Sequence, residues 1–314
     1  MSQFLASQLF QTLIVVLAAP LMLGWVNTIR AWLQNRSGPG VLQPYRVVRK
    51  LLHKDAVLAQ EASWLFRLAP YIVFGCMVVA ASIVPVVATD LPFSPAADVI
   101  ALVGLLALAR MFMALAAMDV GTAFGSMGAR REMLIGCLAE PALLMVFFTP
   151  ALLAQSTALT TIVETLAHQK LAIYPSMAFA AIAFIMVMLA ENARIPIDNP
   201  ATHLELTMIH EAMILEYSGR HLALMEWAHA LKFMVYAAVA VALFVPWGIA
   251  RAGDWQMMPA ALAAFGAKMA LGGAALALLE GVSAKMRIFR APEFLAMAFL
   301  LAVLGMLTHV LLET

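Results

Sequence analysis

The chain has 314 residues, of which 64% are hydrophobic and 12% are charged, and its formal net charge is +1. Soluble domains of this size usually carry about 25% charged residues, so the composition indicates a lipid environment. The near-neutral charge does not favour a polyanionic partner such as nucleic acid. We therefore expect an all-α, polytopic integral membrane protein, with residues 1–314 forming one transmembrane domain.

Eight apolar segments follow one another along the chain, each close to the length that crosses a bilayer. Helical form is expected because backbone groups in lipid must be paired within the segment. The expected spans cover residues 9–29, 68–89, 99–118, 133–155, 172–190, 231–250, 260–282 and 294–312.

Basic residues lie almost entirely on one side of this arrangement. The connections after the first, third, fifth and seventh segments hold fourteen Lys and Arg residues, whereas the other side holds Lys170 and Arg251. An excess of Lys and Arg is typical of cytoplasmic loops. These four connections are therefore predicted to be cytoplasmic, and both termini non-cytoplasmic.

Ionisable residues also occur inside the apolar segments. Arg110, Glu140 and Lys268 lie well within them, where a charge costs about 3 kcal/mol and normally faces a partner in the protein interior. Arg110 and Glu140 are candidates for a static ion pair, but for Glu140 a proton-carrying role is favoured over a static one, because burial favours the protonated carboxyl. Glu280, near the end of the seventh segment, is expected to reach water or to pair with Lys285.

The densest group of charges follows the fifth segment, in the stretch ENARIPIDNPATHLELTMIHEAMILEYSG of residues 191–219. Pro196 and Pro200 each lack a backbone donor and interrupt the helix. A new helix is predicted from Thr202. Apolar residues cover most of its faces, so it is expected to be buried or half-buried.

Three carboxylates, Glu205, Glu211 and Glu216, are interleaved with Leu, Ile and Met in that predicted helix. A simply solvated acidic face would not be interrupted in this way. Glu216 and Arg220 have the spacing of an i,i+4 ion pair. These carboxylates are candidates for proton or charge transfer at the membrane edge.

Familiar metal and redox patterns are missing from the sequence. IHEAMI does not complete a zinc-protease helix, because Ile214 stands where the second histidine would be. His203 and His210 have no obvious third ligand, and Cys76 and Cys137 lie far apart outside any C-x-x-C motif. We expect no catalytic residue set, no metal site and no redox centre in this chain.

Two long motifs resemble the NuoH family, also called complex I subunit 1. QNRSGPGVLQPYRVVRKLLHKD, at residues 34–55, is similar to that family's first cytoplasmic loop, and ENARIPIDNPATHLEL is similar to its E-x-x-R-x-P-x-D-x-P…E-L element. EYSG at 216–219 and the eight-segment layout agree. The positions that match the second motif are Glu191, Arg194, Pro196, Asp198, Pro200 and Glu205.

Within this family, two stretches resemble the HyfC and HycD type of membrane subunit found in group 4 membrane-bound NiFe-hydrogenases, such as formate hydrogenlyase. They are AMDVGTAFGSMGARREM, at 117–133, and PIDNPATHLELTMIHEAMILEYSGRHLALMEWA, which begins at Pro196. One departure from the wider family is Val47, which stands where an acidic residue usually follows the L-Q-P of the first loop. The absence of that acidic residue disfavours a conventional quinone site.

The resemblance implies a non-catalytic subunit in a bacterial or archaeal cytoplasmic (inner) membrane. Such a subunit anchors a cytoplasmic arm of hydrogenase-like large and small subunits and a ferredoxin-like subunit, and it passes charge to antiporter-like membrane subunits. The arm would carry iron–sulfur clusters and possibly a NiFe centre, whereas this chain would hold no cofactor.

The same resemblance implies roles for three groups of residues. The expected relay consists of Glu140, Glu191, Glu205, Glu211 and Glu216. The expected charge partners are Arg110, Arg194, Asp198 and Lys268. The expected docking residues for the soluble arm are Arg36, Arg46, Arg49, Lys50, Arg130 and Arg131.

Three other functions remain open at this point. The first alternative is the quinone-site subunit of a complex I-like NADH:quinone oxidoreductase, and the hydrogenase-like stretches count against it. An independent secondary transporter using Arg110, Glu140 and Lys268 is a second alternative, although no inverted repeat is evident. A purely structural anchor with static charges is the third.

Overall fold

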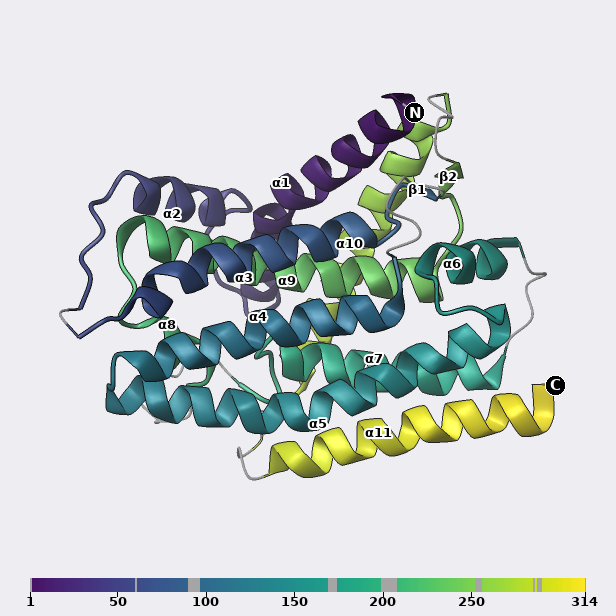
Figure 1. Cartoon of the computed structure of the whole chain (residues 1–314). Helices are drawn as coiled ribbons and strands as arrows, with labels where there is room; N and C mark the ends of the chain where they lie inside the picture. Colours follow the sequence, from purple (N-terminus) through teal and green to yellow (C-terminus); the bar gives the residue numbers. More distant parts are fainter. Residues whose placement is uncertain are drawn as a thin grey trace.

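The structure is a computed structural model of the whole chain, which describes residues 2–59, 61–89, 97–168, 174–198, 208–251, 256–284, 286 and 290–313. It is built almost entirely of helices (Figure 1). The helices are α1 Ser2–Leu33, α2 Gln43–Leu52, α3 Trp64–Ile83, α4 Val99–Asp119, α5 Ala123–Ala154, α6 Leu159–His168, α7 Pro175–Glu191, α8 His210–Ile214, α9 Gly219–Phe244, α10 Met258–Val282, α11 Ala291–Thr308 and the π-helix His309–Glu313. Two short parallel strands, β1 Ala88–Thr89 and β2 Ala250–Arg251, pair at one end.

Seven of the described helices are long and apolar enough to cross a membrane, namely α1, α3, α4, α5, α9, α10 and α11, the last extended to Leu312. The fifth predicted segment corresponds to α7, a shorter apolar helix of 17 residues. At 1.5 Å per residue it is about 26 Å long. The predicted all-α membrane fold is confirmed, while a count of eight crossings stays a prediction.

Several helix boundaries differ from the apolar segments. The segments expected at 133–155 and 231–250 begin at Ala123 and Gly219 in the structure, because charged residues in the N-terminal part of each helix lower the hydropathy without breaking the helix. The segment expected at 68–89 ends as a helix at Ile83, and the chain then leads into β1. Two short helices, α2 and α6, were not predicted.

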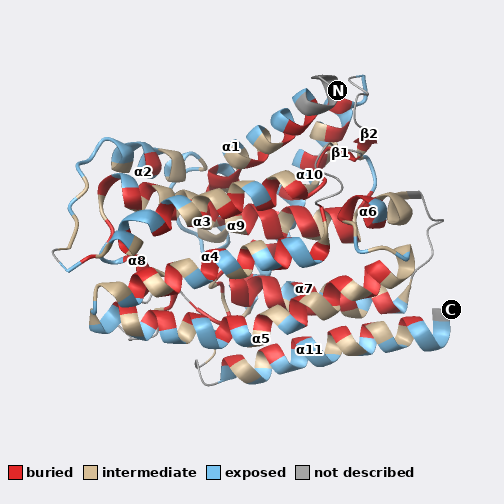
Figure 2. Cartoon of the chain, viewed as in Figure 1, coloured by how far each residue is buried: buried red, intermediate tan, exposed pale blue. Residues whose placement is uncertain are grey.

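The helices pack as a bundle around α9. This helix contacts α1, α2, α3 and α7, and a second set of contacts joins α4, α5, α7 and α11. Figure 2 shows buried residues concentrated where these helices face one another, with exposed residues on the outer faces of the bundle. The outward residues include Leu271, Leu278 and Leu300. Such leucines are suited to face lipid tails.

The two ends of the bundle differ. In Figure 1, α2 and α8 lie at one end, which we call the α8 end, whereas both termini, α6 and the β1–β2 pair lie toward the other. The termini therefore share one end of the bundle, as the sequence predicts. Which end faces the cytoplasm stays a prediction.

Candidate functional site

A group of buried charges surrounds Arg110 of α4. Its guanidinium donates to Glu140 Oε1 at 2.5 Å and to both carboxylate oxygens of Glu191 at 2.6 Å. Arg110 and Glu191 are each 5% exposed. Two further residues, Glu132 and Lys232, complete the group, and we name all five the Arg110 cluster. The ion pair expected between Arg110 and Glu140 is therefore present.

Compensation of charge within the Arg110 cluster is uneven. Lys232 Nζ lies 3.0 Å from Glu191 Oε2, so Glu191 has two close cationic partners. Glu132 Oε1 lies 3.8 Å from Arg110 Nε and 3.9 Å from Lys232 Nζ, beyond direct hydrogen bonds. Three carboxylates against two cations leave one carboxylate in excess. Glu132 is buried and is the most weakly paired carboxylate of the cluster.

The sequence of α5 explains how these groups meet. Glu132, Gly136 and Glu140 are spaced four residues apart and share one face of the helix. A Cβ added at Gly136 would overlap the Arg110 guanidinium, so glycine makes room for the arginine against the helix backbone. Glu191 ends α7, and Lys232 lies on α9. The cluster therefore joins four helices.

Glu280 of α10 forms a second buried ionic group. Its Oε1 accepts from Arg194 Nη1 at 2.9 Å, and its Oε2 accepts from Arg30 Nη1 at 3.3 Å. Arg194 also stacks over the Phe233 ring, with 4.3 Å between Cζ and the ring centroid, a cation–π contact. Two alternatives were expected for Glu280, contact with water or a pair with Lys285. The first is wrong, because Glu280 is 3% exposed. Lys285 lies outside the described residues.

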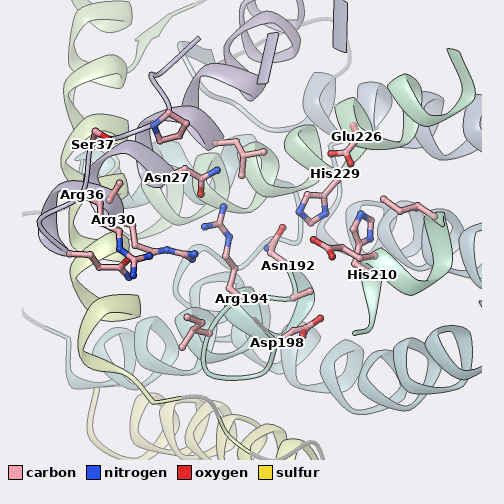
Figure 3. Close-up of a pocket in the computed structure, with 18 residues that line it drawn as sticks. Asn27, Arg30, Arg36, Ser37, Asn192, Arg194, Asp198, His210, Glu226 and His229 are labelled. Atoms are coloured by element: carbon pink, nitrogen blue, oxygen red, sulfur yellow. The ribbon is translucent and has the colours of Figure 1, made fainter. Parts of the chain in front are cut away.

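A polar cavity of about 480 Å³ opens beside these groups at the α8 end. It lies between α1 and the loop that follows it, the loop after α7, α8 and α9. Figure 3 shows Arg30, Arg36 and Arg194 on one side, and His210 and His229 on the other. Its charged lining residues are Arg30, Arg36, Arg194, Asp198, Glu211 and Glu226. One water needs about 10–15 Å³ of such space, so the cavity has room for many waters.

The short helix α8 is held in place by polar contacts to the two residues that precede it. Asp198 Oδ2 accepts from Ile209 N at 3.1 Å, and Arg131 Nη1 donates to Met208 O at 3.3 Å. A Cβ added at Gly128 of α5 would come within 2.9 Å of Ile209 O, so the glycine allows close packing there. Burial, and then the Lys232 charge, lower the pKa of His210 to about 4, so this histidine is neutral near pH 7.

The structure separates the predicted relay carboxylates. Glu140 and Glu191 belong to the Arg110 cluster, and Glu211 lines the polar cavity. Glu216 is exposed and forms no ion pair with Arg220 within the described residues. The predicted i,i+4 pair is wrong, because the chain turns between α8 and α9. Glu205 lies outside the described residues, as do 202–207 of the predicted helix, whose described helical part is His210–Ile214.

Lys268, expected as a charge partner, lies far from these groups. Its Nζ donates to the backbone oxygen of Val245 at 2.6 Å and to that of Trp247. Both carbonyls belong to the chain that follows the end of α9 at Phe244. In the structure, Lys268 therefore links α10 to this connection.

The predicted docking residues gather at the α8 end. Arg46, Arg49 and Lys50 are exposed on α2, whose opposite face buries Val48. Arg36 and Arg130 are also exposed, whereas Arg131 is partly buried. Val47, the departure from the family pattern, lies at a smaller cavity between α1, α2 and α9.

Sequence reasoning missed Glu132 and Lys232. Glu132 follows two arginines in GARREM, which reads as part of a polar connection, and Lys232 stands at the start of an apolar segment. The four-residue spacing of Glu132, Gly136 and Glu140 was a usable signal once α5 was known to begin at Ala123.

Comparisons with known proteins give a consistent set of relatives. Residues 7–311 match the family described as NADH dehydrogenase. Formate hydrogenlyase subunit 4 of Escherichia coli strain K12 is 35% identical over 285 residues, covering 91% of this chain and 92% of the relative. Hydrogenase-4 component C of the same strain is 37% identical over 244 residues, covering 77% and 76%.

More distant similarities agree with these relatives. An NADH-quinone oxidoreductase subunit of Phocaeicola vulgatus is 30% identical over 223 residues, covering 67% of this chain and 59% of the relative. A chain in the structure of the membrane-bound sulfane sulfur reductase, described as an archaeal respiratory membrane complex, has a TM-score of 0.80 at 18% identity. That match covers 98% of this chain and 99% of the other, and it shows a shared fold.

Proposed function

This chain belongs to the NADH dehydrogenase family, and from that premise we propose that it is the membrane-anchoring and ion-coupling subunit of a formate hydrogenlyase-like complex. The observation that carries the proposal is the Arg110 cluster, a buried and incompletely compensated charge group beside a polar cavity. Such a group can respond to a change of charge at the α8 end by binding or releasing a proton.

The relatives favour a hydrogenase complex over a quinone-reducing one. Formate hydrogenlyase subunit 4 matches 91% of this chain at 35% identity, whereas the NADH-quinone oxidoreductase relative matches 67% at 30%. Val47 supports the same choice, because it places an apolar residue where the wider family usually has a carboxylate. The quinone-site function is the weaker alternative.

The partners follow from the same proposal. Hydrogenase-like large and small subunits and a ferredoxin-like subunit would dock on the exposed basic residues of the α8 end, with that end in the cytoplasm of a bacterium or archaeon. Those subunits would carry the iron–sulfur clusters and the NiFe centre, and this chain would hold no cofactor.

Exposure of Glu140 supports a partner within the membrane. Its side chain is 36% exposed although it lies midway along α5. A carboxylate facing lipid there would cost about 3 kcal/mol. We therefore place an antiporter-like membrane subunit against this face of α5, where it would receive charge from the cluster.

Coupling would work through electrostatics. An electron that arrives in the docked arm adds negative charge near the α8 end and increases the affinity of the cluster for a proton. A unit charge about 12 Å away at an effective dielectric constant of about 20 contributes about 1.4 kcal/mol, or about tenfold in proton affinity. Glu132 would bind a proton when the arm is reduced and release it when the electron leaves.

Replacing single carboxylates in the intact complex tests this function. In vesicles that contain the complex, Glu132→Gln and Glu140→Gln should retain hydrogenase activity with an uncoupler present, while ion movement per electron pair falls by at least about tenfold. Glu293→Gln is the matched control, because Glu293 is exposed at the start of α11. Normal ion movement in both variants would refute the coupling function.

Copurification tests the identity of the complex. The native complex should contain a hydrogenase large subunit in stoichiometric amount. A complex that instead contains an NADH-oxidising module and is inhibited by quinone-site ligands would establish the quinone alternative.

A further inference from the structure

Two histidines separate the polar cavity from the Arg110 cluster. A second, small cavity of about 20 Å³ lies beside the cluster, and Arg110, Glu132, Glu191 and Lys232 are among its lining residues. Ala193, His210 and His229 line both cavities. The imidazole rings therefore lie between the large cavity and the buried carboxylates.

The two rings are in direct contact. Their centroids are 4.1 Å apart with an interplanar angle of 27°. His210 is the first residue of α8, and His229 lies on α9, three residues before Lys232. Figure 3 shows the two rings adjacent at the edge of the large cavity. Nε2 of His210 is buried and has no hydrogen-bond partner within the described part of the chain.

The small cavity has the size and the polar lining for one water molecule. A volume of about 10–15 Å³ on this measure is enough for a water that also has two to four polar partners. The cavity exceeds that volume, and its lining residues include Glu132 and Lys232. Arg110 also lines this cavity, and its buried Nε donor has no hydrogen-bond partner among the described residues.

We propose that the stacked His210–His229 pair, with one water in the small cavity, is the proton passage between the large cavity and Glu132. This inference rests on the proposed function and identifies the route by which its protons move. The glutamate relay expected from the sequence includes neither histidine.

The transfer breaks and forms only N–H and O–H bonds. A neutral imidazole accepts a proton on one ring nitrogen from a hydronium ion in the large cavity, which leaves a water molecule there, and it releases a proton from the other nitrogen to the water in the small cavity. That water passes one of its protons to the Glu132 carboxylate. The ring is again neutral, in its other tautomer, and the reverse exchange or a ring flip restores it.

The charges around the pair suit a carrier that rests in its neutral form. The cations Arg110 and Lys232 line the small cavity. The large cavity is lined by three cations and three carboxylates, namely Arg30, Arg36, Arg194, Asp198, Glu211 and Glu226. A resting imidazole without charge can bind and release protons in either direction. A permanently charged pair could donate but not accept.

The first test replaces each histidine in the intact complex. In vesicles, His210→Gln and His229→Gln should lower ion movement per electron pair by about tenfold, while uncoupled hydrogenase activity is retained. His221→Gln is the matched control, because His221 is buried on the same helix against Tyr71 and lines neither cavity. It should leave ion movement unchanged.

Comparison with Glu132→Gln separates the two levels of the proposal. If Glu132→Gln uncouples the complex but both histidine variants move ions normally, protons reach the cluster by another route and this inference is wrong. If Glu132→Gln has no effect either, the proposed coupling function itself fails.

A rescue experiment separates proton transfer from packing. His229→Ala should lose ion movement, and added imidazole should restore it, because the large cavity has ample room for the molecule. Thiazole has a similar size but carries no N–H, so it can fill the space without passing a proton onward. Equal restoration by thiazole, or no restoration by imidazole, would overturn the proposed passage.

Discussion

Arg110 of α4 lies directly against Gly136 of α5, and its guanidinium occupies the space that a side chain at position 136 would need. The glycine stands midway between Glu132 and Glu140 on the same helix face. This close approach is what allows one guanidinium to lie between the carboxylates of two helices, with Glu140 on one side and Glu191 on the other.

Gly136→Ala should disturb the Arg110 cluster. The added methyl group must push the guanidinium away from Glu140 or Glu191, and such overpacking costs about 1–3 kcal/mol. Thermal unfolding of the detergent-purified protein should show a lower midpoint. Gly104→Ala on α4 is the control, because a Cβ at that position meets no atom within 4 Å. Equal midpoints for the two variants would contradict the tight packing described above.

Lys232→Met should leave the cluster with three carboxylates and one cation. Removing one partner of a buried ion pair typically costs about 3–5 kcal/mol. The double variant Lys232→Met, Glu132→Gln restores the original balance of charge and should recover part of that loss. A double-mutant cycle on unfolding free energy measures the coupling, and strictly additive effects would show that Glu132 carries no charge linked to Lys232.

Glu280→Gln should weaken the link between α1, α10 and the loop after α7. The change removes the negative charge that lies between Arg194 and Arg30, leaving two buried or partly buried cations uncompensated. We expect a loss of about 3 kcal/mol, read from chemical denaturation in detergent. Glu216→Gln, at an exposed position, should change stability by less than about 0.5 kcal/mol. A similar small effect at Glu280 would contradict the pairing.

Stability should fall on acidification, in part because of His210. Its pKa is lowered to about 4 in the folded protein by burial and by Lys232, whereas the unfolded chain has a pKa of about 6.5. The unfolded state therefore binds a proton first, so the contribution of His210 is complete above about pH 6.5 and is lost as pH falls toward about 4. The difference in unfolding midpoint between about pH 7.5 and about pH 5 should be smaller in His210→Gln than in the unchanged protein.

Other titrating groups near His210 are present in both the unchanged protein and His210→Gln. They include His229, Glu211 and Glu226, and Asp198 lies beside α8. The difference between the two proteins in the pH dependence of the midpoint therefore reports on His210. An identical pH dependence with and without the imidazole would show that His210 is protonated with equal ease in the folded and unfolded states.

Local composition was enough to find most of the helices and part of the site. Arg110 and Glu140 stand out because each is a charge inside an apolar run, and this position predicts an ion pair between them. Glu132 was missed because the preceding arginines make its neighbourhood resemble a connection, although α5 passes straight through it. Glu280 was misjudged because its position near a helix end suggested water, while its true partners are Arg194 and Arg30.

The sequence by itself determined that this protein lies in a membrane as a helical bundle, because the free energy of placing a segment in lipid depends on the residues within that segment. It also determined the family, through motifs that are contiguous in the chain. Apart from the Arg110–Glu140 pair, the tertiary structure decided which charges meet: Arg110 and Glu191 are 81 residues apart in sequence and 2.6 Å apart in space. Such contacts depend on how helices cross and on which helix faces carry glycine, and no local stretch of residues specifies them.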